Sequence, residues 1–211
     1  MFKSLFKPDS SLMITMNWIT DSIFLSLFWL MGCIPLVTVG ASFAALYDAA
    51  YRGYRQGEKN SWQRFLHTYR KNWKTGIGPT VVVLAAALGL GKALIALWNG
   101  AATGSIGWMV FSGGAFVGVL LFGILSILFP MLSRFENSFA GLLKNTVLIG
   151  LANLPRTLAL GIVNAAAVFL CIRFVVPVFF LPALAALIGS LFIEPMFKPY
   201  MPEEETEEAA L

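Results

Sequence analysis

GIGPTVVVLAAALGLGKALIALW, residues 76–98, and WMVFSGGAFVGVLLFGILSILFPML, residues 108–132, are the two stretches that decide the fold. The first contains one charged residue, Lys92, and the second contains none. About 20 apolar residues in a helix cross a hydrocarbon core that is ~30 Å thick, so the two runs predict a pair of membrane-spanning helices. Gly114 and Gly118 form a small-xxx-small pair in the second run, which favours close packing of another helix of this chain.

The rest of the chain has the same apolar character. Of its 211 residues, 58% are hydrophobic and 12% are charged, whereas soluble domains contain about 25% charged residues. The mean hydropathy is +0.76. Further apolar runs at 157–172 and 177–193 predict additional spans. We predict an all-α, polytopic α-helical membrane protein with five to six membrane segments plus interfacial amphipathic helices, in which residues 1–202 form a single helical membrane domain.

The first apolar run, residues 16–51, is too long for one simple span and only just long enough for two. Near its centre lies IPLVTVG, residues 34–40. Pro35 removes a backbone donor and Gly40 permits a turn, so with Thr38 they form a candidate hairpin motif. The alternative is one long, kinked and tilted helix.

Basic residues gather between the apolar runs. Seven of the fifteen lie in the connection 52–75, and a second connection covers 133–156. The positive-inside rule predicts that both connections are cytoplasmic, and this use of the basic residues argues against nucleic-acid binding. A hairpin then places both termini in the cytoplasm, whereas one kinked helix would place Lys3 and Lys7 outside. Residues 203–211 contain five glutamates and are predicted to be a disordered acidic tail.

Residues 61–74 have the pattern of an amphipathic surface helix. Aromatic and apolar side chains recur on one helical face, and basic side chains occupy the rest. Such a helix lies on the lipid bilayer with its aromatic edge among the headgroups and its basic groups near anionic lipids. We expect contacts to anionic lipid headgroups from Trp62, Arg64, Arg70, Lys71, Trp73 and Lys74, with Phe65, Leu66 and Tyr69 on the apolar face.

Ionisable residues within or near membrane segments are the first candidates for a functional site, because burying a charge in a bilayer is costly. They form either a functional polar cluster or structural pairs near the interface. Asp48 and Glu194 lie near the cytoplasmic ends of their segments, where we expect them to reach water. Lys92 can extend its charged end outward. The candidate intramembrane polar residues are Asp21, Asp48, Lys92, Arg173 and Glu194.

The common constellations for catalysis and metal binding do not occur in the sequence. His67 is the only histidine, and it lies among basic residues. Cys33 and Cys171 sit in separate apolar runs, which indicates free thiols. We therefore predict no enzyme, no metal and no cofactor.

Two motifs resemble a known family. IPLVTVG is followed by Ala44, Ala45, Leu46 and Tyr47, and a second motif contains Phe65, Tyr69, Asn72, Trp73 and Lys74. Both are similar to segments of the YesL family of Gram-positive bacterial membrane proteins, a domain of unknown function. The resemblance implies a multi-pass protein of the plasma membrane. Because such genes often lie beside carbohydrate-uptake transporters, it also implies a link to sugar import and to carbohydrate ABC-transporter permease subunits. It implies no established reaction.

Two classes of function remain open. The first is an accessory or interaction component associated with carbohydrate uptake. The second is a small membrane transporter or channel that acts as an oligomer, because six short helices enclose little space. Transporters often contain repeats with paired broken helices, and the break at Pro35 has no clear counterpart. The sequence therefore favours the accessory component.

Overall fold

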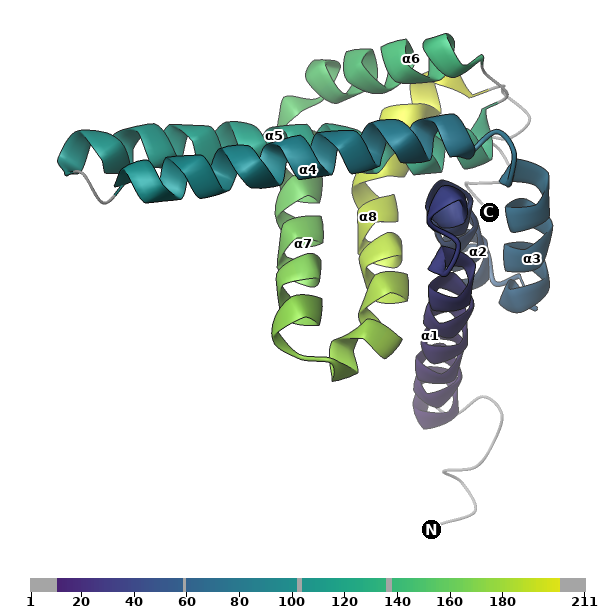
Figure 1. Cartoon of the computed structure of the whole chain (residues 1–211). Helices are drawn as coiled ribbons and strands as arrows, with labels where there is room; N and C mark the ends of the chain where they lie inside the picture. The colour runs from purple at the N-terminus through teal and green to yellow at the C-terminus, as the bar shows by residue number, and fades with distance from the viewer. Residues whose placement is uncertain (1–10, 59, 102–103, 136–137, 202–211) are drawn as a thin grey trace.

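Helices of the α and 3-10 types are the regular elements in the described part of the chain. The structure, a computed structural model, describes residues 11–58, 60–101, 104–135 and 138–201 (Figure 1). The predictions for Lys3, for Lys7 and for the acidic tail concern residues outside these ranges. The helical elements are α1 (Ser11–Cys33), η2 (Leu36–Thr38), α2 (Val39–Arg55), α3 (Ser61–Asn72), α4 (Ile77–Ala101), α5 (Ser105–Arg134), α6 (Phe139–Ala152), α7 (Leu154–Arg173), η3 (Val176–Phe179), α8 (Leu181–Phe197) and η4 (Lys198–Tyr200).

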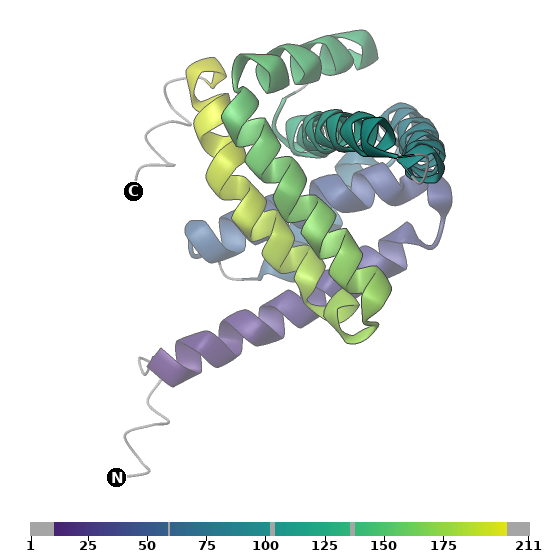
Figure 2. The ribbon, with the colours of Figure 1, turned by 90° about the vertical axis from the view of Figure 1, so that its left-hand side faces the viewer.

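The first apolar run folds into two helices, α1 and α2, that turn back on each other (Figure 2). Pro35 has an extended backbone, with φ −77° and ψ 113°, so it cannot continue α1. The Thr38 hydroxyl donates to the carbonyl oxygens of Gly32 and Pro35, both at 2.9 Å, and so caps the end of the helix. The chain has the hairpin, and not the long kinked helix.

Helix α2 is the central element of the body. Every residue from Gly40 to Tyr51 except Phe43 is buried, and most of them are small. Small side chains let neighbouring helices approach closely, and α1, α3, α5 and α8 all pack against α2. This helix is therefore covered by protein on nearly all sides.

Helices α4 and α5 form an antiparallel pair whose far end projects beyond the rest of the molecule (Figure 1). We call this pair the arm. A Cβ at Gly114 would meet the side chain of Leu97, and one at Gly118 would lie 3.3 Å from Leu90, both on α4. The two glycines thus pack against a helix of the same chain, as predicted. Gly104, with φ 129°, lies between the two helices in a conformation that favours glycine.

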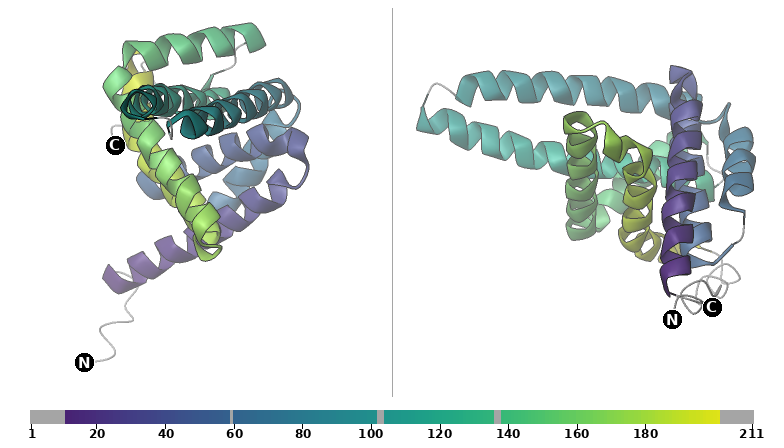
Figure 3. Two further views of the ribbon diagram at one scale, coloured as in Figure 1. Left: turned by 60° about the vertical axis from the view of Figure 1, so that its left-hand side comes forward. Right: turned by 90° about the horizontal axis from the view of Figure 1, so that it is seen from below.

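Helices α7 and α8 form a second pair, which runs across the direction of the arm (Figures 1 and 3). Where α7 crosses α5, a Cβ at Gly123 would collide with the carbonyl oxygen of Thr157, and one at Gly161 with that of Val119. The crossing therefore depends on two glycines that let the backbones touch. Helix α6 ends at Ala152, and Pro155 lies in the first turn of α7, where its missing N–H breaks no helical hydrogen bond.

The described helices fit a membrane protein. Four of them are long and apolar enough to cross a bilayer, namely α4, α5, α7 and the segment Leu181–Tyr200 that joins α8 and η4. The described apolar part of α1, Ile19–Cys33, is shorter, as is α6. The protein is thus an all-α, polytopic helical membrane protein, in which the hairpin α1–α2 and the amphipathic α3 accompany the four long helices.

Candidate functional site

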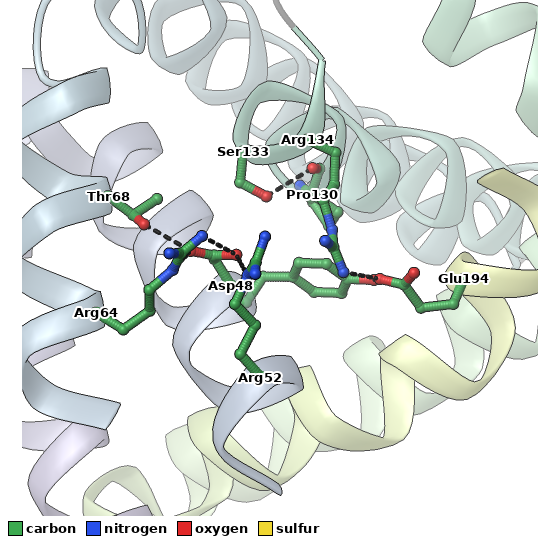
Figure 4. A network of polar contacts seen from close by, with 9 residues as sticks. Asp48, Arg52, Arg64, Thr68, Pro130, Ser133, Arg134 and Glu194 are labelled. Carbon is green, nitrogen blue, oxygen red and sulfur yellow. Dashed lines mark hydrogen bonds and ion pairs between the residues drawn. The ribbon is translucent and has the colours of Figure 1, made fainter. Parts of the chain in front are cut away.

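A buried carboxylate lies at the contact between α2 and α3. Asp48 is only 1% exposed. Its Oδ2 accepts hydrogen bonds from Arg64 Nε at 2.6 Å and from Thr68 Oγ1 at 2.6 Å, both from α3 (Figure 4). Its Oδ1 accepts one from Arg52 Nε at 3.1 Å, one turn further along α2. One carboxylate is therefore held by two guanidinium groups and a hydroxyl.

The surroundings of Asp48 favour its charged form. Burial by itself raises the pKa of a carboxyl group, because it removes water from the charge. The hydrogen bonds from Arg64 and Thr68 and the positive charges of Arg64 and Arg52 outweigh that effect, so the pKa of Asp48 lies below its ordinary value. The carboxylate is therefore a fixed negative charge and a poor proton carrier near neutral pH.

A second buried ion pair lies on the other side of α2. Glu194 on α8 accepts hydrogen bonds from Arg134 Nη2, at the end of α5, at 2.9 Å and from the Tyr47 hydroxyl at 2.8 Å. The Arg134 guanidinium also lies 4.4 Å from the centre of the Tyr51 ring, a cation–π distance. Tyr47 and Asp48 are consecutive, so α2 connects the two ion pairs. We call the whole set the charge junction: Tyr47, Asp48, Arg52, Arg64, Thr68, Arg134 and Glu194.

The charge junction contains two of the five candidate polar residues. The expectation that Asp48 reaches water is wrong, because its side chain is only 2% exposed, whereas the side chain of Glu194 remains 11% exposed beside Arg134. Asp21, Lys92 and Arg173 are exposed, and each lies on a helix surface away from the junction. Two of the candidates therefore form ion pairs inside the protein, and the other three lie outside the charge junction.

Sequence patterns do not reveal the partners of these two carboxylates. The amphipathic pattern predicts a lipid contact for Arg64, but its guanidinium binds Asp48. No motif marks Arg134 or Thr68 as a partner of a carboxylate. Helical spacing does place Thr68 one turn after Arg64 on α3, which is the only local signal for a shared partner.

The outer face of α3 retains the other expected headgroup residues. Phe65 on the opposite face is buried against α2, with Ser61, Thr68 and Asn72 beside it. Trp62 and Trp73 are exposed. A shallow hollow on this outer face is lined by Trp62, Gln63, Leu66, His67, Arg70 and Lys71. The apolar residues of α3 are thus divided between a protein contact and an exposed surface.

The hairpin motif connects α2 to the start of α4. The Gly40 N–H donates to Thr80 Oγ1 at 2.9 Å, and the Thr80 hydroxyl donates to the carbonyl oxygen of Gly76 at 2.7 Å. A Cβ at position 40 would lie 2.8 Å from a ring carbon of Phe129 and 2.9 Å from the Gly76 oxygen. Only glycine fits, so Gly40 serves a close helix contact in addition to the turn after Pro35.

In the charge junction each carboxylate is paired with arginine side chains of the same chain. Both carboxylates are neutralised by arginines, and the arginines come from α2, α3 and α5. In the described ranges, no group of three or more His, Cys, Asp and Glu side chains is placed to hold a metal ion. The junction therefore positions helices against each other by fixed charges, and the described side chains offer it no free acid or base.

Part of the chain matches a known protein family. Residues 22–92 match the model of a family described as "Protein of unknown function, DUF624". The YesL family is a DUF624 family, so the match agrees with the resemblance at the level of this domain. We found no match among curated proteins or among solved structures. The matched residues extend from α1 into α4, so they contain the hairpin motif and the whole Asp48 half of the charge junction.

Proposed function

We propose that the protein is an accessory or interaction component of a membrane transport system, and that this system is one of carbohydrate uptake. The observation that carries the proposal is the exposed apolar surface of the arm. Leu88 on α4 is 68% exposed and Met109 on α5 is 74% exposed, and similar residues follow along both helices. Within the described chain only α5 covers α4 over most of its length, so the rest of its surface is available to lipid or to another membrane helix.

One flank of the arm has the residues that membrane helices use for close contact. Ala85, Gly89 and Ala93 recur every four residues on α4, and all three are exposed. A Cβ at Gly89 would meet nothing within 4 Å. Leu90 and Leu94 on the adjacent face already contact Gly118 of α5, so the small residues point away from the arm's own interface. This flank suits a helix of a partner subunit.

The choice of carbohydrate uptake comes from the resemblance to the YesL family, whose genes often lie beside such transporters. Carbohydrate ABC-transporter permease subunits are therefore the partners we propose. The proposal includes a plasma-membrane location with both termini in the cytoplasm, since the connections 52–75 and 133–156 are basic. It includes contact of the outer face of α3 with anionic lipid headgroups and no catalytic step.

The test is purification of the full chain from its native membrane in a mild detergent, followed by identification of the membrane proteins that accompany it. We expect permease subunits in the wild-type sample. Gly89→Leu should release them, because a leucine at this position blocks close helix approach. Gly91→Leu is the matched control, since Gly91 is also free of contacts within 4 Å but lies on the other flank of α4.

The alternative function is a small transporter or channel that acts as an oligomer. It would replace our proposal if the purified protein carried no partner and moved a sugar or ion when reconstituted alone in liposomes. Asp21→Asn and Lys92→Met would then show whether the movement depends on these exposed charges.

A further inference from the structure

A largely apolar cavity of about 290 Å³ lies between the hairpin α1–α2 and helices α5, α7 and α8. This volume is near the lower end of the range for small-molecule sites, ~300 Å³. On α7 its lining extends from Leu160 to Ile172. At a rise of ~1.5 Å per residue this length is about 18 Å, close to the ~15 Å of one leaflet of the hydrocarbon core. The cavity therefore has the length of a single acyl chain.

One wall of the cavity carries an unsatisfied donor. Trp29 Nε1 is buried and has no hydrogen-bond partner among the described residues. The indole ring stands edge-on to Phe43, with centroids 5.1 Å apart, and both rings line the cavity. Buried tryptophan N–H groups usually have a partner, because an unpaired one loses its hydration without compensation. A bound molecule with an acceptor oxygen at this position would supply it.

The cavity opens toward the outside of the molecule at the end of α7. Val168 and Ile172 line it and are themselves exposed. The next residue, Arg173, is exposed, lies over the Phe174 ring at 5.6 Å, and has no carboxylate partner within the described part of the chain. The start of α8 lies beside α1 here, since the Ala183 N–H donates to Ser26 Oγ at 3.3 Å. The cavity thus opens near Arg173 at the end of α7, and the unpaired donor of Trp29 lines the same cavity.

We propose that this cavity holds one acyl chain of a bilayer phospholipid, whose ester oxygen accepts the hydrogen bond of Trp29 and whose phosphate lies beside Arg173. The apolar walls would receive the chain, the Trp29 N–H would bind an acceptor oxygen, and Arg173 would attract the phosphate. A phospholipid combines the three features that these groups can bind, namely a hydrocarbon chain, an ester oxygen and an anionic phosphate. This site is distinct from the headgroup contacts of α3.

Photolabelling tests the proposal with the full chain in nanodiscs. The probe is phosphatidylglycerol with a diazirine near the end of one acyl chain, and the labelled residues are mapped by mass spectrometry. Leu160 and Ile193 line the inner part of the cavity and are only 1% and 2% exposed. We expect saturable labelling of these two residues, because a chain in the surrounding bilayer cannot reach them. Labelling confined to exposed residues such as Ile162 would overturn the proposal.

Two substitutions on α7 test whether filling the cavity lowers the labelling, or whether any phenylalanine added to this helix does so. Ala167 lines the cavity, whereas its neighbour Ala166 is exposed and does not. Ala167→Phe should lower the inner labelling by roughly tenfold, because a phenyl ring occupies space that a close-packed interior cannot restore. Ala166→Phe should leave it unchanged, and equal effects of the two would contradict the proposal. If Ala167→Phe does not fold, the wild-type label map decides alone.

Arg173→Gln tests the headgroup. It should weaken labelling by the phospholipid by about fivefold or less, because an exposed ion pair is weak. It should also abolish the preference for the phospholipid over a diacylglycerol with the same diazirine chain, which lacks the phosphate. An unchanged preference would overturn the assignment of the phosphate to Arg173.

Discussion

Asp48→Asn is the substitution that tests the charge junction most directly. Asparagine keeps the size of the side chain and can still accept the Thr68 hydrogen bond, but it removes the negative charge that Arg64 and Arg52 share. Both guanidinium groups then remain close to each other without their common partner. The change therefore isolates the charge from the shape of the site.

The expected loss of stability in Asp48→Asn depends on how deeply Asp48 and its two arginine partners are buried. Removing one member of a fully buried ion pair costs about 3–5 kcal/mol, whereas an exposed pair contributes about 0–1 kcal/mol. The Asp48 side chain is 2% exposed, but those of Arg64 and Arg52 are 27% and 26% exposed, so water can hydrate the arginines once the carboxylate is gone. We expect Asp48→Asn to lower the free energy of unfolding by about 2–3 kcal/mol.

The assay is reversible unfolding of the purified chain by sodium dodecyl sulfate in mixed micelles, followed by circular dichroism. Double-mutant cycles with Arg64→Gln and Arg52→Gln give the two coupling energies. We expect about 1–2 kcal/mol for Asp48 with Arg64, and about 0.5 kcal/mol for Asp48 with Arg52, a pair within one helix. Asp21→Asn is the control, because Asp21 is exposed and its replacement should change stability by less than about 0.5 kcal/mol.

We also expect Asp48→Asn to change how the stability of the fold depends on pH in the acid range. Because the folded chain lowers the pKa of Asp48, this residue stabilises the fold fully above its unfolded pKa of ~3.9. That contribution is lost as the pH falls from there through the folded pKa. Wild-type protein should therefore lose stability more steeply below about pH 4 than Asp48→Asn does. The reasoning is refuted if Asp48→Asn is no less stable than Asp21→Asn, or if the two acid profiles are parallel.

Two further predictions concern helix contacts. Gly123→Ala should lower the unfolding free energy by about 2 kcal/mol or more, because its Cβ collides with the backbone carbonyl of Thr157. Gly118→Ala should change it by less than about 1 kcal/mol, because the new Cβ meets only the flexible ends of leucine side chains. Thr80→Val should cost about 1–2 kcal/mol in the same assay, because the buried N–H of Gly40 then has no acceptor. Equal losses for the two glycines, or no loss for Thr80→Val, would contradict these contacts.

The sequence predicted those features that depend on local patterns. The ends of α4 and α5 follow from the lengths of two apolar runs, and the break at Pro35 follows from the missing N–H. Gly114 and Gly118 were recognised because their four-residue spacing puts them on one helical face. Gly123 and Gly161 were not recognised, because they lie on different helices and only the crossing of α5 with α7 brings them together.

The orientation of α3 could not be derived from its sequence alone. An amphipathic basic helix has the same pattern whether its apolar face meets lipid or protein. Phe65 packs on α2 because the alanines there leave room for a second helix, yet alanines also raise the hydropathy that makes α2 resemble a membrane span. The burial of Asp48 has the same origin, since its main partner is supplied by the docked α3.

The charge junction also indicates how the part of the chain that matches DUF624 is joined to the rest. Asp48 and its three partners all lie within residues 22–92, so this part neutralises its own buried carboxylate. Arg134 and Glu194 lie outside it and neutralise each other. The link between the two pairs is the hydroxyl of Tyr47 and the ring of Tyr51, both uncharged. Neither part therefore depends on the other for a counter-ion. It follows that changes in α7 or α8 that spare Glu194 should leave the Asp48 contact intact, and that the Asp48–Arg64 coupling should be the same in Tyr47→Phe as in the wild-type chain.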